Sequence, residues 1–236
     1  MLLGLTYNIC YGKRLPKIQE WLRTHNTSYD LICFQEFPYS QLYRFQSDKA
    51  FTFYFASGFR KHGETYGELT LVRTKKVKIV ASQIINLGGS IYEKRVFRTT
   101  GARSSLVTML EYRKRPFILA NTHLTAFSFN HHRKKQLDKL IQHLGSEFFV
   151  QHTPMVILGD LNYSSLFGRK GLLKLMQEQE YTNAYLENTH KFLNVKKHQL
   201  DYIFHKNCAI ADVQVLRQPF SDHFPIQFTL SLTKSS

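Results

Sequence analysis

The sequence predicts an α/β fold in which two packed β-sheets carry helices on their outer faces. Many short runs are rich in Val, Ile, Phe, Tyr and Thr, a few segments have helical periodicity, and no linker or repeat divides the chain. Eleven such strand-like runs exceed what one open sheet comfortably holds, which favours two sheets. We therefore expect one domain over residues 1–236, long enough to bury a sizeable core.

The predicted strands are recognised by their β-branched and aromatic residues. In chain order they are Leu2–Ile9, Leu31–Gln35, Phe51–Ala56, Leu69–Arg73, Val77–Ile85, Ser105–Tyr112, Phe117–Asn121, Met155–Leu158, Tyr202–His205, Val213–Leu216 and Ile226–Leu232.

Three segments show the 3.6-residue spacing of a helix. The first begins near Pro16, a position where proline is tolerated, and its apolar face is formed by Leu15, Ile18, Trp21 and Leu22. The second is roughly twenty residues long from about Phe129. Its apolar face is formed by Leu137, Leu140, Ile141, Leu144 and Phe148. Gly171–Gln179 is the third predicted helix.

The chain is strongly basic, with 32 Lys and Arg against 17 Asp and Glu and a formal net charge of +15. Such an excess predicts a polyanionic partner: nucleic acid, anionic phospholipid or phosphorylated small molecules. The basic clusters are Arg73 to Lys78, Arg113–Arg115, His131–Lys135 and Lys196–Lys197. We interpret each cluster by itself as a solvent-exposed surface, the first two at hairpin tips.

Several classes of protein are disfavoured. No apolar run reaches the about 18 residues of a transmembrane helix. The first residues lead directly into a predicted strand and lack a signal-peptide core, so we expect an intracellular, cytoplasmic protein. Cys10, Cys33 and Cys208 are odd in number and widely spaced, which argues against disulfides or a zinc site. The sequence does not indicate whether the protein is a monomer or an oligomer.

Polar groups follow several apolar runs at the predicted strand ends. Asn8 and Glu36 close the first two strands, and their oxygens suit a hard cation such as Mg²⁺. Each also has a simpler interpretation, as a turn residue and a surface glutamate. His123 follows Asn121-Thr122 and would donate to a phosphoryl oxygen, although a lone histidine is more often structural.

The remaining polar groups lie in the second half of the chain. Asp160 and Asn162 are two residues apart, which predicts one side of an extended segment where they would orient a water. A calcium loop is disfavoured because no glycine and distal glutamate follow. Asp222 and His223 are adjacent and point in different directions, so Asp201 is the predicted partner that fixes the tautomer of His223. A serine-hydrolase triad is excluded, since contiguous residues cannot form that relay.

This ordered set resembles the endonuclease/exonuclease/phosphatase superfamily, and the resemblance extends from residue 6 to about residue 228. Its members include abasic-site endonucleases, DNase I, neutral sphingomyelinases, inositol-polyphosphate phosphatases and deadenylases. The matching pieces are Asn8, Gln35-Glu36, Thr122-His123-Leu124, Gly159-Asp160-Leu161-Asn162, Asp201-Tyr202 and Ser221-Asp222-His223. The resemblance implies a DNase I-like four-layer α/β sandwich: two packed mixed β-sheets flanked by helices, with the active site at one rim.

The resemblance also implies a role for each matching residue. Glu36 is the implied main ligand of Mg²⁺, or Mn²⁺, with Asn8 beside it and Asp222 as a further metal or water ligand. The implied catalytic residues are His223, Asp160, Asn162, His123 and Asp201. Of these, Asp160 would orient or deprotonate the attacking water, Asn162 would hold that water or a phosphate oxygen, and Asp201 would orient His223.

The expected activity is a Mg²⁺-dependent phosphodiesterase with nuclease-like action. The net charge favours nucleic acid. His123, where abasic-site endonucleases carry tyrosine, and the absence of a Trp-rich segment in Lys191–Leu200 favour a phospholipid or phosphoinositide substrate instead. No apolar hairpin for membrane contact is evident in the sequence, and Cys10 is unsuited to a hard metal. A non-catalytic basic binding module is the remaining alternative.

Overall fold

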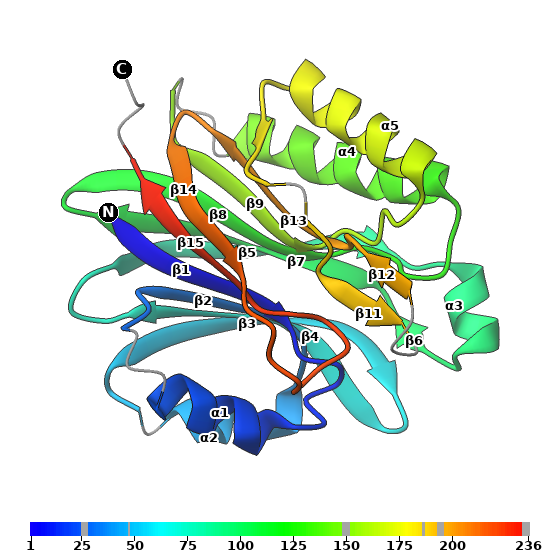
Figure 1. The fold of residues 1–236 in the computed structure, drawn as a ribbon, viewed down its shortest axis with the longest axis horizontal. Helices are drawn as coiled ribbons and strands as arrows, with labels where there is room; N and C mark the ends of the chain where they lie inside the picture. The colour runs from blue at the N-terminus through cyan, green and yellow to red at the C-terminus, as the bar shows by residue number, and fades with distance from the viewer. Residues whose placement is uncertain (25–27, 47, 148–151, 186, 193–195, 233–236) are drawn as a thin grey trace.

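Two β-sheets pack face to face in the computed structural model, and helices cover the outer face of each sheet (Figure 1). The structure describes residues 1–24, 28–46, 48–147, 152–185, 187–192 and 196–232. Each sheet is mixed, since each contains one parallel strand pair among antiparallel ones. The predicted α/β sandwich with flanking helices is thus confirmed.

The first sheet has the strand order β14-β15-β1-β2-β4-β3-β6. Its strands are β1 (Leu2–Asn8), β2 (Leu31–Pro38), β3 (Phe51–Lys61), β4 (Glu64–Arg73), β6 (Thr100–Gly101), β14 (Ala209–Val215) and β15 (Ile226–Ser231). β1 runs parallel to β2, so both strands end at the same edge of the sheet.

The second sheet has the order β10-β13-β9-β8-β7-β5. Its strands are β5 (Lys78–Gly88), β7 (Arg103–Tyr112), β8 (Arg115–His123), β9 (Met155–Asp160), β10 (Thr182–Asn183) and β13 (Asp201–Lys206). β8 and β9 are parallel, and β13 begins beside the end of β9. β11 (His190–Phe192) and β12 (Lys196–His198) form a separate two-stranded ribbon.

The helices are α1 (Leu15–Thr24), α2 (Tyr43–Gln46), α3 (Ile91–Val96), α4 (Asn130–Glu147) and α5 (Leu166–Glu178), with a 3₁₀ turn at Tyr39–Gln41. α1 buries Leu15, Ile18 and Trp21 against the first sheet. α4 and α5 cover the second sheet (Figure 1). Leu137 and Leu140 of α4 pack into the core. Phe148, predicted on the apolar face of α4, lies outside the described residues.

Three clusters of apolar side chains fill the spaces between the layers. Leu31, Val72 and Phe228 of the first sheet meet Phe117 and Leu158 of the second, all essentially without exposed surface. Burial of side chains of this size stabilises the fold by about 1.5–3 kcal/mol each. The other two clusters lie between each sheet and its helices.

All eleven predicted strands and all three predicted helices are present. The elements missed by the sequence are short, from two to six residues: α2, α3, β6, β10, β11 and β12. Two predictions about the basic clusters are wrong. The segment Arg73–Lys78 connects β4 of one sheet to β5 of the other and is not a hairpin tip. In the cluster His131–Lys135, Arg133 is buried rather than exposed, and its Nε donates to the Thr125 carbonyl at 2.8 Å. The basic segment at Arg113–Arg115 does join the hairpin of β7 and β8.

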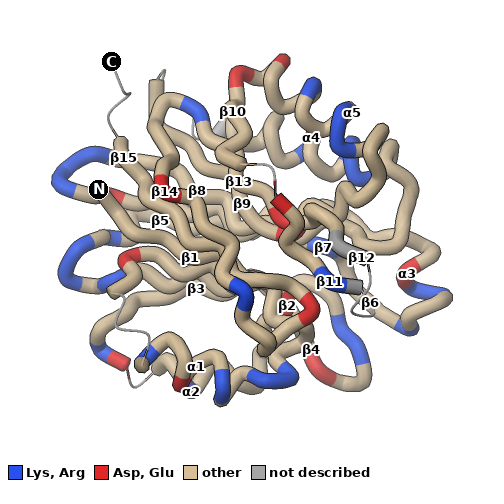
Figure 2. Tube along the Cα trace, viewed as in Figure 1, with Lys and Arg blue, Asp and Glu red and all other residues tan. Residues whose placement is uncertain are grey.

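Lys and Arg are spread over much of the outer turns and helices, including the turn between β7 and β8 (Figure 2). Among the described residues, no helix is long and apolar enough to cross a membrane.

Candidate active site

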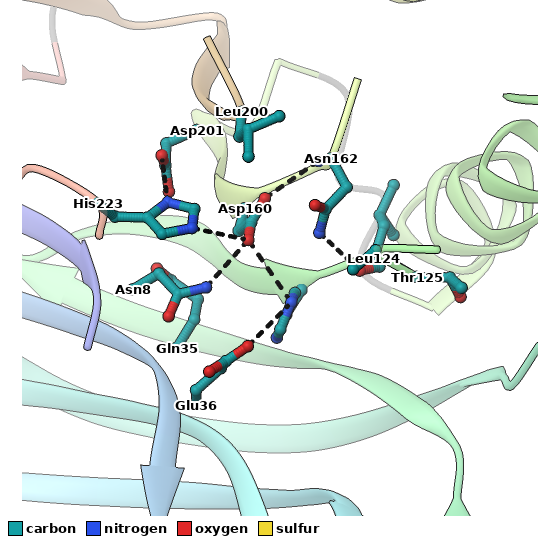
Figure 3. A network of polar contacts seen from close by, with 12 residues as sticks. Asn8, Gln35, Glu36, Leu124, Thr125, Asp160, Asn162, Leu200, Asp201 and His223 are labelled. Atoms are coloured by element: carbon teal, nitrogen blue, oxygen red, sulfur yellow. Dashed lines mark hydrogen bonds and ion pairs between the residues drawn. The ribbon is translucent and has the colours of Figure 1, made fainter. Parts of the chain in front are cut away.

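The predicted polar residues lie close together in the structure, where β1, β8 and β9 end and β13 begins (Figure 3). Asn8 ends β1, His123 ends β8 and Asp160 ends β9. In the second sheet, Asp160 pairs with His123 on one side and with Asp201 on the other. A cavity of about 340 Å³ lies at this end, and it is lined by Asn8, Glu36, His123, Asp160, Asn162, Asp222 and His223.

Glu36 reaches this cavity through an irregularity in β2. The register with β4 shifts between Phe34 and Phe37, and Glu36 has a left-handed φ of 57°. Glu36 Oε2 accepts a hydrogen bond from the Tyr11 backbone N–H at 3.0 Å, and its Oε1 lies 3.8 Å from His123 Nε2. Burial raises the pKa of Glu36, while the charge of Arg103 partly offsets that effect. The strained backbone and costly buried carboxylate are typical of a functional position.

Asp160 is the centre of the polar network. Its Oδ2 accepts a hydrogen bond from Asn8 Nδ2 at 2.9 Å, and its Oδ1 accepts one from the Asn162 backbone N–H at 3.1 Å. Oδ2 also lies 3.6 Å from His123 Nε2 and 3.7 Å from His223 Nε2. Burial raises the pKa of Asp160 to about 7, against the lowering effect of His223. Such a carboxylate is suited to exchanging a proton with water near neutral pH.

His223 is held by Asp201, which does not line the cavity itself. Asp201 Oδ2 accepts hydrogen bonds from His223 Nδ1 at 2.8 Å and from the Thr189 hydroxyl at 2.6 Å. Burial alone would lower the pKa of His223, but Asp201 and Asp160 outweigh it and raise this pKa to about 10. His223 is therefore cationic at neutral pH, with Nε2 directed at Asp160 (Figure 3).

His123, unlike His223, carries no charge. Burial, followed by the nearby charges of Arg103 and His223, holds the pKa of His123 well below its usual value. His123 is therefore neutral at neutral pH, and the adjacent cation is Arg103, whose Nη1 lies 3.0 Å from His123 Nδ1. Arg103 is buried, forms a 2.6 Å ion pair with Glu93 and stacks on the Phe59 ring at 4.3 Å.

Arg103, Thr189 and His190 are site residues that sequence reasoning missed. Arg103 and His190 line the cavity, and the ring of His190 lies 4.7 Å from that of His223. Arg103 is one of 32 basic residues, and no local pattern marks it. His190 lies in a three-residue strand that shows no periodicity.

The backbone at Asn162 differs from its prediction. Asn162 has a left-handed φ of 57° and follows the end of β9, so it does not share an extended segment with Asp160. Its side chain still lines the cavity, and its Nδ2 donates to the Leu124 carbonyl at 3.1 Å. The turn, rather than strand alternation, brings the two residues to the same cavity.

The donor set at the cavity suits a hard divalent cation. Glu36, Asp160 and Asp222 all present carboxylates to the cavity, and burial raises the pKa of Glu36 even though the charges of Arg103 and His223 partly offset this effect. Burial would raise the pKa of Asp222, but hydrogen bonding to His190 and the charge of His223 keep it below its usual range. The metal-compatible trios among the described residues are His190-Asp222-His223 and Asp160-Asp201-His223, and neither includes Glu36. Burial raises the pKa of Cys10 to about 12, so this lining thiol stays protonated.

A four-layer sandwich with carboxylates, amides and histidines at one rim defines a class of phosphoester hydrolases. Residues 5–223 match the model of the Endonuclease/Exonuclease/phosphatase family, and the chain belongs to this family. It is accordingly an enzyme, a metal-dependent hydrolase that acts on phosphate ester bonds.

Solved structures show the same fold. The human Nocturnin catalytic domain with bound sulfate is 19% identical, with a TM-score of 0.74 and 98% of this chain and 94% of that chain covered. TDP2 of D. rerio, complexed with a single strand DNA product, is 14% identical, with a TM-score of 0.73 and 98% of each chain covered. The mannosyl-6-phosphatase Bt3783 of Bacteroides thetaiotaomicron VPI-5482 is 17% identical, with a TM-score of 0.72 and coverage of 98% and 99%. No curated protein matches the sequence significantly.

Proposed function

We propose that the chain is a phosphodiesterase that requires Mg²⁺, for which Mn²⁺ can substitute. The observation that carries this proposal is one cavity lined by four carboxylates, four histidines and Arg103. Carboxylates serve a hard cation and an attacking water, while cationic groups bind the anionic ester. The polar set is intact, which argues against a non-catalytic binding module.

In the proposed reaction, Glu36, Asn8 and Asp222 would hold the ion. When bound, the ion would neutralise charge that develops on the phosphoryl oxygens. Asp160 would align the attacking water and accept its proton, a role that fits its pKa of about 7.

The other residues would bind and orient the phosphate. His223 would donate from Nε2 to a phosphoryl oxygen, and its raised pKa supports a cationic stabiliser rather than a general base. Asp201 is a positioning residue for His223, through the 2.8 Å hydrogen bond to Nδ1. His123, beside Arg103, would contact the phosphate from the other side, and Asn162 would hold the water or an oxygen.

Nucleic acid is the first substrate candidate. We call the cavity of about 340 Å³ around Glu36 and Asp160 the catalytic cavity. A second cavity of about 570 Å³ shares Cys10 and Asp222 with it. It is lined by four cations: Lys13, Arg14, Lys191 and Arg217. Flanking phosphates of a polynucleotide would bind there, and the DNA product held by the TDP2 structure supports this substrate class.

Phospholipid or phosphoinositide is the second candidate, because the catalytic cavity also has an apolar wall. Phe97 and Phe127 line the cavity with stacked rings, whose centroids are 4.0 Å apart. A wall of this kind would accept the apolar part of a lipid ester. An intracellular, cytoplasmic location remains a prediction that cell fractionation would check.

An activity panel with purified full-length protein tests the proposal. The substrates are single- and double-stranded DNA, RNA, sphingomyelin, phosphoinositides and bis(p-nitrophenyl) phosphate, each with Mg²⁺, Mn²⁺ or EDTA. We expect metal-dependent hydrolysis, and a loss of at least about a hundredfold in Glu36→Ala and His223→Ala.

The matched control is Glu20→Ala on the exposed face of α1, which should keep wild-type activity. The proposal is wrong if hydrolysis survives EDTA, or if Glu36→Ala and Glu20→Ala hydrolyse the simple diester equally well.

A further inference from the structure

An exposed apolar surface lies beside the catalytic cavity. It is formed by six large side chains that project from three segments: Ile91, Tyr92, Val96, Phe127, Phe129 and Phe167. We call this surface the apolar rim. Phe129 and Phe167 expose 77% and 85% of their area, which is costly in water unless something covers them.

The three segments are adjacent in the fold although they are far apart in sequence. The Ser90 hydroxyl at the start of α3 donates to the Phe127 carbonyl at 3.4 Å. The Tyr163 hydroxyl, just before α5, donates to the Asn130 carbonyl at the start of α4 at 3.5 Å. Figure 1 shows α3 and the N-terminal ends of α4 and α5 together at one end of the molecule.

The apolar rim continues into the catalytic cavity. Phe97, which directly follows α3, and Phe127 of the rim both line the cavity. Ser164, three residues before Phe167, also lines it. The apolar rim and the lining of the cavity are therefore continuous through Phe127.

The charge around the rim is positive. Segments 90–101, 125–135 and 163–171 contain one acidic residue, Glu93, which is buried in its ion pair with Arg103. The exposed cations of these segments include Lys94 and Arg95 on α3 and Lys170 on α5. The surface thus combines protruding apolar groups with cations and presents no exposed acid.

We propose that the apolar rim docks the enzyme onto an anionic phospholipid bilayer. The apolar side chains would enter the interface between headgroups and acyl chains, and the neighbouring cations would bind anionic headgroups. A bilayer fits better than single-stranded nucleic acid, because Ile91 and Val96 offer no ring on which a base can stack. A docked bilayer would present its lipid phosphates to the cavity.

Binding is tested by sedimentation of full-length protein with vesicles in EDTA, so that no turnover is needed. The vesicles contain phosphatidylcholine alone, or with about one third phosphatidylserine. We expect binding to the anionic vesicles, and a loss of roughly a hundredfold in affinity for the triple variant I91S/F129S/F167S. The control Y54S/V80S/I84S removes three exposed apolar groups from β3 and β5 and should bind like wild type.

A second pair of variants tests the charge. K94Q/R95Q should weaken vesicle binding by about thirtyfold, since each basic residue near an anionic surface contributes about 1 kcal/mol. R113Q/K114Q removes the same charge at the β7–β8 turn and should change affinity by less than about twofold.

The proposal is overturned if the triple variant binds vesicles as wild type does, or loses no more affinity than its control. It is also overturned if the triple variant loses affinity for a single-stranded oligonucleotide while vesicle binding persists, which would assign the rim to nucleic acid. The triple variant, measured in parallel, should hydrolyse bis(p-nitrophenyl) phosphate at the wild-type rate. A failure of that assay in wild type would contradict the proposed function and not the docking surface.

Discussion

Asp201 accepts two short hydrogen bonds, at 2.8 Å from His223 Nδ1 and 2.6 Å from Thr189 Oγ1. Because the amide of an asparagine can donate where an acceptor is needed, Asp201→Asn should release the imidazole from its orientation. We expect kcat to fall by at least about a hundredfold while KM changes less than about threefold, measured by steady-state kinetics. The exposed Asp212→Asn on β14 is the control. Equal kcat values in the two variants would contradict the positioning role.

Glu68 is a buried carboxyl whose titration should be visible in stability. It accepts a hydrogen bond from the Ser104 hydroxyl across the two sheets. Burial raises the pKa of Glu68 from 4.5 to about 8, and the Ser104 hydrogen bond only partly offsets this. Below pH 4.5 the carboxyl is protonated in both the folded and the unfolded state. Between pH 4.5 and about 8 only the unfolded state ionises, so rising pH removes stability.

Glu68→Gln should abolish that pH dependence. We expect the variant to gain stability over wild type as pH rises, by up to about 1.4 kcal/mol per pH unit within this window. Denaturant unfolding at about pH 5 and about pH 8 measures the difference. The exposed Glu20→Gln variant should show no such gain in stability over wild type. If the free energy of unfolding of Glu68→Gln varied with pH as that of wild type does, Glu68 would be ionised in the folded state.

At the scale of single residues, the sequence predicts a side chain best where it ends an apolar run. Glu36, His123 and Asp160 each do so, and all three line the cavity. Arg103 escaped prediction because it begins its strand, and only the folded sheet brings it to His123. The charge states of the two histidines could not be predicted from the sequence. Burial and neighbouring charges lower the pKa of His123, which is neutral, whereas neighbouring carboxylates raise the pKa of His223, which is cationic.

At the scale of elements, Asn121 joins the two sheets beneath the site. From β8 its Nδ2 donates to the Phe34 and Leu69 carbonyls of β2 and β4, both at 3.1 Å, and its Oδ1 accepts from Gln35 Nε2 at 2.7 Å. Asn121→Ala leaves buried polar groups without this partner. The free energy of unfolding should fall by about 2–4 kcal/mol, as measured by denaturant titration.

The comparison is Asn188→Ala, an exposed asparagine whose replacement should change the free energy of unfolding by less than about 0.5 kcal/mol. Similar losses in both variants would show that the inter-sheet contacts of Asn121 add nothing to stability.

The long elements could be predicted because they alternate or repeat over several residues, as α4 does with Leu137, Leu140 and Leu144. The short α3 has six residues and a hydroxyl cap at Ser90, and fewer than two turns are too little for periodicity to show. The apolar rim could not be predicted for the same reason. Its side chains come from segments such as 91–96 and 166–178, which only the fold brings together.

At the scale of the whole molecule, carboxylates and cations meet at two neighbouring cavities that share Asp222. The catalytic cavity contains Glu36, Asp160 and Asp222, whereas Lys13 and Lys191 line the neighbouring cavity. With a net charge of +15, the molecule attracts any polyanion at long range, so affinity alone does not identify the substrate. The salt dependence of binding is more informative, because its slope reports how many phosphates lose their counterions to cations of the protein.

For a single-stranded oligonucleotide, the slope of log affinity against log salt should therefore depend on the cations beside the site. K13Q/K191Q removes two of the four cations of the second cavity and should reduce the magnitude of the slope by about 1.4, as two lost phosphate contacts would. R113Q/K114Q lowers the net charge equally at the β7–β8 turn, so it should slow association without changing the slope. Fluorescence anisotropy of the oligonucleotide across a salt series, in EDTA, measures the slope for both double variants. Identical slopes in the two double variants would mean that oligonucleotide phosphates do not occupy the second cavity, and the nucleic-acid candidate would lose its structural support.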